Sequence, residues 1–439
     1  MTMNSLIRPA ETGDLAPSTH VRPESVIRRH WLFFAATAAV MLHIADDNFF
    51  QPNPGVSPAD HLVSGLVPLG LLGLGAWTYD RVRAGNRALI ASSTGLTGLV
   101  VGLVEPISHL GSVGLRNDDY TGLVAAVAAL VLLAMSAVTL WRSRRLDDGR
   151  ARRYVRRTVK GVVAVVVLTQ VVAIFGFTYV ITHVSRAELQ TPHLGTPHEN
   201  VTLTTSDGLH LEGWYIPSRN GAAVIAFPGR KGPQAHARML AKNGYGVLLF
   251  DRRGEGASEG DGNLLGWGGA RDIDAAVDFL KQRADVDPGR IGGIGFSVGG
   301  ELMLEAAAGN KDITAVVSEG AGTRTLSEQL QEFDGFTLAR GFPQMVALTA
   351  GTALFSGDAP PTSLVDLAPR IAPRPALIIW APNGGNQETM SPKYARRIGA
   401  SAEVWAMDDV KHIKGLQTHP EEYERRVVGF FDRALPAHP

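Results

Sequence analysis

Long apolar runs fill the first part of the chain, whereas shorter apolar and polar stretches alternate through the rest. Five of the long runs approach or reach the roughly 20 residues that a helix needs to cross a bilayer, and none contains an internal Lys or Arg. They cover residues 31–45, 62–79, 88–104, 121–141 and 162–184. The pattern predicts an all-α transmembrane region over residues 31–184, built from about five helices.

The charged residues between these runs predict how the helices are oriented. Arg and Lys gather before the first run, between the second and third, and over residues 142–160, between the fourth and fifth. The intervening loops carry mainly Asp and Glu. Because basic loops stay on the cytoplasmic side, residues 1–30 are expected to form a cytoplasmic tail of a multi-pass cell-membrane protein. Five crossings then place the carboxyl half outside the cytoplasm.

A group of acidic residues and histidines falls near the predicted outer ends of the first three runs. Polar groups at membrane depth are costly unless they have a role, so this group either forms a metal or substrate-entry site or lies wetted at the headgroup level. The sequence names no metal for it. Its members are His43, Asp46, Asp47, Asp60, His61, Glu105 and His109.

The carboxyl half begins after a linker at residues 185–200 and reads as one domain over 201–439. The stretches 201–205 and 209–216 flank a Ser-Asp-Gly turn and predict a hairpin. Strands then alternate with helices, which indicates an α/β fold with a doubly wound, mostly parallel sheet covered by helices. The further strands are expected at residues 222–227, 246–250, 290–294, 313–317, 376–380 and 403–407, with helices at 272–283 and 423–435.

Charge and cysteine content narrow the possible chemistry. Lys and Arg together number 42, as do Asp and Glu, so the overall charge gives no indication of nucleic-acid binding. The chain has no cysteine, which excludes a thiol nucleophile, a disulfide and a cysteine-bound metal. Nothing in the composition predicts an oligomeric state.

The five residues Gly295 to Gly299 have the pattern G-x-S-x-G, with Ser297 in the middle. They follow a short apolar run and precede a helical one, so a strand, a sharp turn and a helix are expected. A turn of this kind holds its serine in a strained conformation and projects the hydroxyl at the carboxyl end of the strand. Ser297 is therefore the candidate nucleophile.

Residues 201–435 resemble a bacterial serine hydrolase of the α/β-hydrolase superfamily. The matching stretches are residues 227–230 after the third strand, 251–258 with the family's D-x-R-G-x-G-x-S turn, and 295–299. The resemblance implies a triad in the order Ser, acid, His, and the late His412 corresponds to its base. The alternatives for the base are His210, His419 and His438.

The acid of the triad departs from the family pattern. The family places an aspartate just past the seventh strand, but residues 381–392 contain none. Glu388 stands four residues before Pro392, as the family acid often stands before its proline. The other candidates are Glu319, just past the sixth strand, and Asp408 or Asp409.

The resemblance also implies an oxyanion hole and a cap. Two backbone N–H groups should face the developing oxyanion, one from Val298 after the nucleophile and one from Arg230 in the loop after the third strand. The short insertion at about residues 325–368 stands where the family carries a cap over the active site. Its apolar residues suit an acyl chain, or equally a small core within the cap.

These features predict a membrane-anchored serine hydrolase, carboxylesterase- or lipase-like, that cleaves a carboxylic ester through an acyl-enzyme. The expected substrate is a small-molecule or lipid-like ester, and no cofactor, metal or nucleic acid is expected to take part. An amidase or peptidase and an acyltransferase are alternatives with the same triad. A non-catalytic, membrane-tethered binding module is the alternative from another class.

Overall fold

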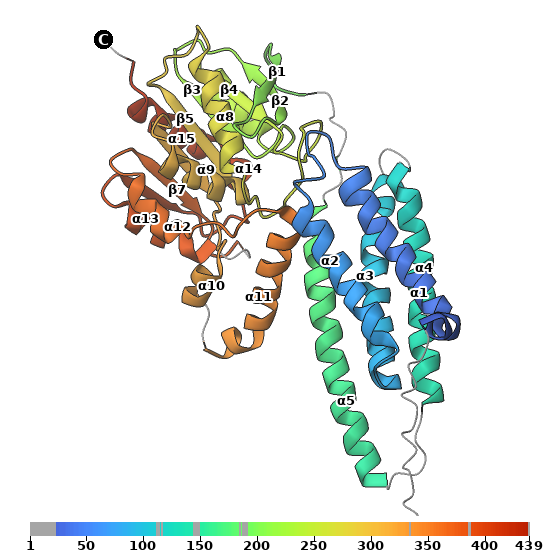
Figure 1. Ribbon diagram of the computed structural model, residues 1–439. Coiled ribbons are helices and arrows are strands. Elements are labelled where there is room, and N and C mark those ends of the chain that lie inside the picture. Colours follow the sequence, from blue (N-terminus) through green and yellow to red (C-terminus); the bar gives the residue numbers. More distant parts are fainter. Residues whose placement is uncertain are drawn as a thin grey trace, which may run out of the picture.

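The computed structural model shows a bundle of helices beside an α/β domain (Figure 1). Most of the expected tail 1–30 and part of the expected linker 185–200 lie outside the described residues. The structure describes residues 23–110, 115, 117–143, 150–183, 186, 192–332, 335–384 and 388–437.

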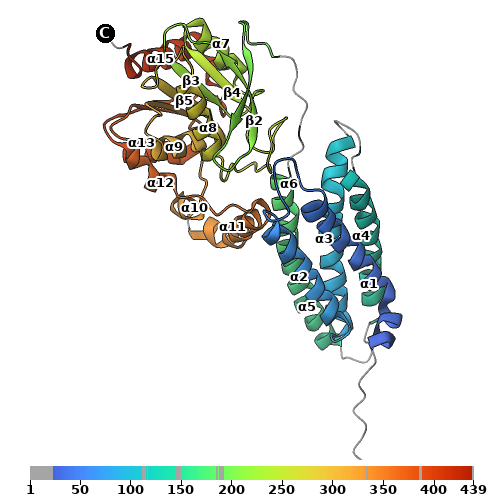
Figure 2. The same ribbon diagram turned by 45° about the horizontal axis from the view of Figure 1, so that its top comes forward.

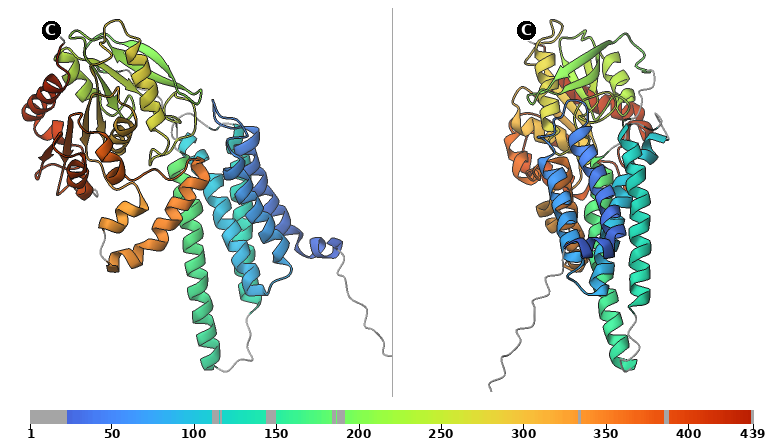
Figure 3. Two further views of the ribbon diagram at one scale, coloured as in Figure 1. Left: turned by 60° about the vertical axis from the view of Figure 1, so that its left-hand side comes forward. Right: turned by 45° about the vertical axis from the view of Figure 1, so that its right-hand side comes forward.

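Each of the five long apolar runs is helical, and the helices lie side by side in every view (Figures 1 and 3). By length and composition, three of the helices among the described residues could cross a membrane: Leu62–Tyr79, Ala84–Ile107 and Asp118–Arg142. The elements are α1 (Pro23–Ala45), η1 (Asp46–Phe50), α2 (Leu62–Tyr79), α3 (Ala84–Leu110), α4 (Asn117–Arg142), α5 (Arg150–Val171), η2 (Val172–Phe177) and α6 (Thr178–Thr182).

The helical region turns its large apolar side chains outward. Among the described residues, all but five of the exposed large hydrophobic side chains lie between Trp31 and Val180. The inside of the bundle combines small residues, including the fully buried Ala91, Ala125 and Ala129, with a few large ones such as Phe33 and Leu132. Small residues at helix contacts with large apolar ones outside are typical of helices that pack within a membrane.

The α/β domain is built on one sheet with the strand order β1-β2-β4-β3-β5-β6-β7-β8. The pairs β1–β2 and β2–β4 are antiparallel and all other pairs are parallel, which confirms the predicted mostly parallel sheet. The strands are β1 (Glu199–Thr204), β2 (His210–Ile216), β3 (Ala223–Phe227), β4 (Gly246–Phe250), β5 (Ile291–Phe296), β6 (Ala315–Glu319), β7 (Ala376–Trp380) and β8 (Ala402–Ala406).

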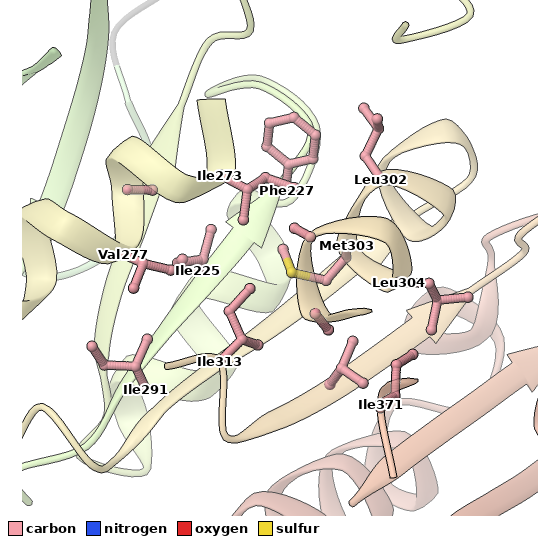
Figure 4. Packing of buried hydrophobic residues seen from close by; sticks show 14 of the residues in the cluster. Ile225, Phe227, Ile273, Val277, Ile291, Leu302, Met303, Leu304, Ile313 and Ile371 are labelled. Carbon is pink, nitrogen blue, oxygen red and sulfur yellow. The ribbon is translucent and has the colours of Figure 1, made fainter. Parts of the chain in front are cut away.

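Helices cover both faces of the sheet because successive strand residues point to opposite sides. From β3, Ile225 and Phe227 pack in one core layer, whereas Val224 and Ala226 pack in the other. Figure 4 shows Ile225 beside Val277 of a covering helix. The first layer is covered by α8 (Ala270–Lys281), α9 (Val298–Gly309) and α13 (Ser391–Ile398), and the second by α7 (Gln234–Lys242) and α15 (Pro420–Ala434), as Figure 2 shows.

The middle of the insertion between β6 and β7 packs against the helical region, and its last part packs against the α/β domain. The insertion forms α10 (Leu326–Glu332), α11 (Gly335–Ser356), α12 (Leu364–Leu367) and η3 (Ala368–Arg370), and α11 contacts α2, η2 and α6. Phe355 of α11 belongs to the apolar core of the helical region. At Gly351 a Cβ atom would lie 2.6 Å from the hydroxyl oxygen of Thr178, so only glycine permits this approach.

Backbone contacts join the two regions at a second place. Leu264 N–H donates to the carbonyl of Ile181 at 2.8 Å, and Gly260 N–H donates to the carbonyl of Pro54 at 2.9 Å. The side-chain amide of Asn53 donates to Asp261 at 3.0 Å. The α/β domain is therefore tied to the end of α6 and to the loop before α2.

Candidate active site

Ser297 stands between β5 and α9 with φ of 53° and ψ of −126°, a strained conformation for a residue with a side chain. The two flanking glycines make this turn possible. A Cβ atom on Gly295 would lie 2.2 Å from the carbonyl oxygen of Gly299, and one on Gly299 would lie 2.5 Å from Cδ of Pro228. Strand, turn and helix are thus packed too closely for any larger residue at either position.

The hydroxyl of Ser297, the ring of His412 and the carboxylate of Glu388 form one chain of hydrogen bonds. Nε2 of His412 lies 2.8 Å from Oγ of Ser297, and Nδ1 lies 2.5 Å from Oε1 of Glu388. The carboxylate only accepts, so Nδ1 carries the proton and Nε2 is free to accept one from the serine. The three residues follow β5, β8 and β7, so the sheet brings their loops together at one edge.

Glu388 is held in place by the loop that follows β7. Its side chain is buried and its second oxygen, Oε2, accepts a hydrogen bond from Ala381 N–H at 2.7 Å. Glu388 begins the short helix η4 (Glu388–Met390), directly before α13. The carboxylate therefore has one oxygen fixed by the backbone and the other on His412.

The other candidate acids make different contacts in the described structure. Glu319 accepts the N–H of Gly415 at 3.1 Å and the hydroxyl of Tyr423 at 2.5 Å. Burial raises the pKa of its carboxyl. Gly415 begins the short helix α14 (Gly415–Thr418), so Glu319 anchors the loop that carries His412.

The carboxylates of Asp408 and Asp409 do not reach His412 in the part of the chain that the structure describes. Asp409 pairs with His419 at 2.8 Å, and the backbone carbonyl of Asp408 accepts from Asn383. Among the alternative bases, His419 is thus engaged by Asp409 and His210 by Glu259. His438 lies outside the described residues.

The two expected oxyanion donors differ in the structure. Val298 is the first residue of α9, where backbone N–H groups have no partner within the helix. The expectation for Arg230 is corrected, because its N–H donates to Oδ1 of Asp251 at 2.7 Å. One N–H carries one proton, and in this conformation the buried carboxylate of Asp251 takes it.

The turn that resembles the family's D-x-R-G-x-G-x-S motif is a structural element. Asp251 also binds the guanidinium of Arg230 at 2.9 Å, and its carbonyl accepts the hydroxyl of Ser258 at 2.8 Å. Arg253 forms an ion pair with the buried Asp272 at 2.7 Å. These contacts fix the loops after β3 and β4 beside the nucleophile.

Glu301, a partly buried carboxyl one turn after Ser297 in α9, was not predicted from the sequence. Burial raises the pKa of Glu301 to about 7, although Arg324 nearby favours its charged form. Its Oε1 accepts the N–H of Gly322 at 3.1 Å. No local motif marks this residue, because its burial depends on packing against the loop after β6.

The side chains that are placed to share a metal ion lie away from Ser297. Among the described residues, Asp47, Glu105 and Asp118 of the helical region form such a group. The Ser297 site brings together a hydroxyl, an imidazole and a carboxylate, which are the groups that a nucleophile, a base and an orienting acid require.

A family model described as X-Pro dipeptidyl-peptidase (S15 family) matches residues 183–413, which is more than half of the chain. The chain belongs to this family. The uncharacterized protein YfhR of Escherichia coli O157:H7 is 32% identical over 257 residues, or 54% of this chain and 81% of that protein. The polyketide transferase grgF of a Penicillium species is 34% identical over 137 residues, or 28% of this chain and 44% of that protein.

Several relatives match this chain over only part of their own length. The chain spans 40% of the length of the YfhR proteins of two Salmonella strains, at 37% identity over 118 residues. Among solved structures, an esterase of Pyrococcus furiosus is similar at 24% identity with a TM-score of 0.47, over 58% of this chain and 98% of that one. The predicted α/β-hydrolase fold, preceded by apolar helices, is confirmed.

Proposed function

We propose that this chain is a membrane-anchored serine hydrolase that cleaves a carboxylic ester outside the cytoplasm. The hydrogen-bond chain from Ser297 through His412 to Glu388 carries the proposal. The strained turn at Ser297 supports it, because a strained nucleophile at the carboxyl edge of a parallel sheet is typical of hydrolysis by this fold.

The reaction follows from the orientation of the three side chains. Oγ of Ser297 attacks the ester carbonyl while Nε2 of His412 takes the hydroxyl proton, and Glu388 stabilises the imidazolium that forms. The N–H of Val298 donates to the oxyanion. The tetrahedral intermediate collapses, the alkoxide leaves with the proton from Nε2, and an acyl-enzyme remains. Water then attacks the acyl-enzyme with the same base, releasing the acid and restoring Ser297.

The cap indicates where the substrate comes from. Three of the five exposed large hydrophobic side chains outside the span 31–180 lie on α10 and α11: Leu330, Phe342 and Val346. Since α11 packs against α2, η2 and α6, its exposed apolar residues lie beside helices with an apolar outer surface. We propose that this side of α11 contacts the outer leaflet and that the substrate is an ester with an apolar acyl chain.

The proposed orientation rests on the basic loops and is tested with the whole chain. Alkaline phosphatase fused to the carboxyl terminus should be active, and a fluorescent protein that folds only in the cytoplasm should stay dark at the same position. An active cytoplasmic reporter with an inactive phosphatase would overturn the orientation without affecting the catalytic assignment.

A peptidase is the second candidate, favoured by the description of the matching family model. A Ser-His-acid triad can also cleave amides. Acyl transfer is the third candidate, favoured by the relative named as a polyketide transferase. The test compares p-nitrophenyl esters from acetyl to octanoyl with an X-Pro p-nitroanilide, using the full chain in nanodiscs. Ester turnover that rises with chain length and disappears in Ser297→Ala supports the proposal. Faster cleavage of the anilide would make the chain a peptidase.

A further inference from the structure

Three carboxylates meet inside the helical region, each from a different element. Asp47 belongs to η1, Glu105 to α3 and Asp118 to α4, and one carboxylate oxygen of each lies within 4.8 Å of the others. Carboxylates this close repel one another unless a cation or shared protons lie between them. The packing of three separate helices thus brings together carboxylates whose mutual repulsion a cation or shared protons would relieve.

Tyr179 of α6 points at the same place. The residue is 2% exposed, and it lines a cavity together with Asp47, His43 and Ser64. Among the described residues, this hydroxyl has no partner that meets strict hydrogen-bond geometry, and the carboxylate that it faces is that of Asp47. Buried hydroxyls are rarely left in this state, so the geometry leaves room for a ligand beside the carboxylates.

His183 presents a lone pair to Asp47. Nδ1 of His183 lies 3.0 Å from the carbonyl oxygen of Tyr179, which can only accept, so Nδ1 carries the proton. Nε2 then has a lone pair, and it lies 3.9 Å from Oδ2 of Asp47. That separation is too long for a hydrogen bond. It suits a cation that lies about 2.1 Å from each atom.

We propose that Asp47, Glu105 and Asp118 bind one divalent cation, with His183 and Tyr179 completing its surroundings. The donors are mostly carboxylate oxygens with one imidazole, which favours a cation of the Mg²⁺, Ca²⁺ and Mn²⁺ class over softer metals. Asp47 and Glu105 belong to the polar group that the sequence indicated near the outer ends of the helices, whereas Asp118, His183 and Tyr179 are added by the structure.

The other members of that polar group already have partners. Asp46 accepts from the hydroxyl of Thr121 at 2.7 Å, and Asp60 accepts from the hydroxyl of Ser57 at 2.8 Å. Nε2 of His43 lies 3.0 Å from the carbonyl oxygen of Val101. His61 lies 3.5 Å from Asp261 of the α/β domain, and the side chain of His109 is outside the described part of the structure.

The site goes beyond the proposed hydrolysis, because it joins the helices to the segment that carries the α/β domain. Tyr179 and His183 flank the end of α6, which lies between the bundle and the α/β domain in Figure 2. The ring of Tyr179 also packs edge-on against Phe355 of α11, with centroids 5.5 Å apart. A cation there holds α6 and the cap to the helices α3 and α4.

The test is Mn²⁺ binding to the full chain in nanodiscs after treatment with a chelator. Electron paramagnetic resonance of free Mn²⁺ should show about one saturable site per chain, and Mn²⁺ should raise the thermal midpoint. Glu105→Gln and Asp118→Asn should each weaken Mn²⁺ binding about tenfold or more. Asp60→Asn removes an exposed carboxylate on the same side and should leave the affinity unchanged.

Tyr179→Phe keeps the ring packing and removes only the hydroxyl, so it serves if the carboxylate variants do not fold. It should weaken Mn²⁺ binding several-fold. The proposal is overturned if the wild-type chain binds no Mn²⁺ saturably, or if Asp60→Asn loses as much affinity as Glu105→Gln. Neither result would affect the role proposed for Ser297, which is measured separately as ester turnover.

Discussion

The helical region and the α/β domain place apolar and acidic residues in opposite ways. In the α/β domain, large side chains such as Phe227 and Phe250 are fully buried, while in the helical region Trp77 and Val127 are 60% and 64% exposed. The difference indicates that the two regions of this chain suit different solvents. Burial in the α/β domain follows the rule for water, whereas the outward apolar faces of the helices suit lipid.

Acidic side chains that are shielded from solvent, fully or in part, also differ between the two regions. In the α/β domain the buried acids have hydrogen-bond donors of their own: Glu388 has His412 and Ala381, and Glu319 has Gly415 and Tyr423. In the helical region three carboxylates converge instead. Separate donors fix single side chains for chemistry, and convergence creates a place for a shared cation.

The largest effect is expected from neutralising one of the two buried acids near His412. Glu388→Gln should lower ester turnover about a thousandfold or more, because an amide cannot stabilise the imidazolium and can hold the wrong tautomer. Glu319→Gln should change turnover much less, since Glu319 contacts the backbone of the His412 loop rather than the ring. Both variants are measured on one soluble ester.

Thermal unfolding of each variant is the control for folding. Glu319→Gln is expected to lower the midpoint more than Glu388→Gln does. A severe loss of turnover in Glu319→Gln beside a mild one in Glu388→Gln would transfer the orienting role to β6.

A smaller effect is expected from separating the cap from the helices. Gly351→Leu would place atoms where Thr178 lies, and overpacking of this kind costs about 1–3 kcal/mol. Turnover of an ester embedded in vesicles should fall about tenfold, while a soluble short-chain ester should be cleaved at the normal rate.

Gly341→Ala is the matched control on the same helix, because the nearest atom to a Cβ there is Sδ of Met345 at 3.7 Å. It should leave both substrates unaffected. If Gly351→Leu and the wild-type chain cleaved the embedded ester at the same rate, the contact between the cap and the helices would have no role in supplying the substrate.

The smallest effect concerns pH. Burial raises the pKa of Glu301 from an ordinary value of 4.5 to about 7. The native state therefore binds a proton that the unfolded chain has released, and stability falls as pH rises from 4.5 through 7. Glu301→Gln has no carboxyl at this position and so does not lose stability in this way. The thermal unfolding midpoint of the variant minus that of the wild-type chain should therefore increase between pH 5 and pH 8. Parallel profiles for the two chains would contradict the assignment.

Local patterns predicted most of the α/β domain and the core of its site. The strands at 246–250 and 376–380 begin and end where expected, and Ser297 stands in the expected turn. These strands and this turn could be predicted because residues close together in the sequence specify them, as apolar runs bounded by turn residues. The pairing of His412 with Glu388 was predicted through family order, but only the fold distinguishes Glu388 from Glu319.

Features that depend on distant contacts were not predicted. The N–H of Arg230 is taken by Asp251, which is 21 residues away in the chain. An apolar helix at 335–356 does not by itself show that it will pack against α6. Tyr179 and His183 look like ordinary residues at a helix end, and only the packing of α3, α4 and α6 brings them near three carboxylates.

Covalent labelling is the direct test of whether Ser297 is the nucleophile. The full chain in nanodiscs is treated with a fluorophosphonate, and the labelled peptide is identified by mass spectrometry. We expect a single adduct on Ser297, formed far more slowly in His412→Ala and at the normal rate in Ser327→Ala, which changes an exposed serine of the cap. Absence of labelling, or an adduct on another serine, would contradict the account.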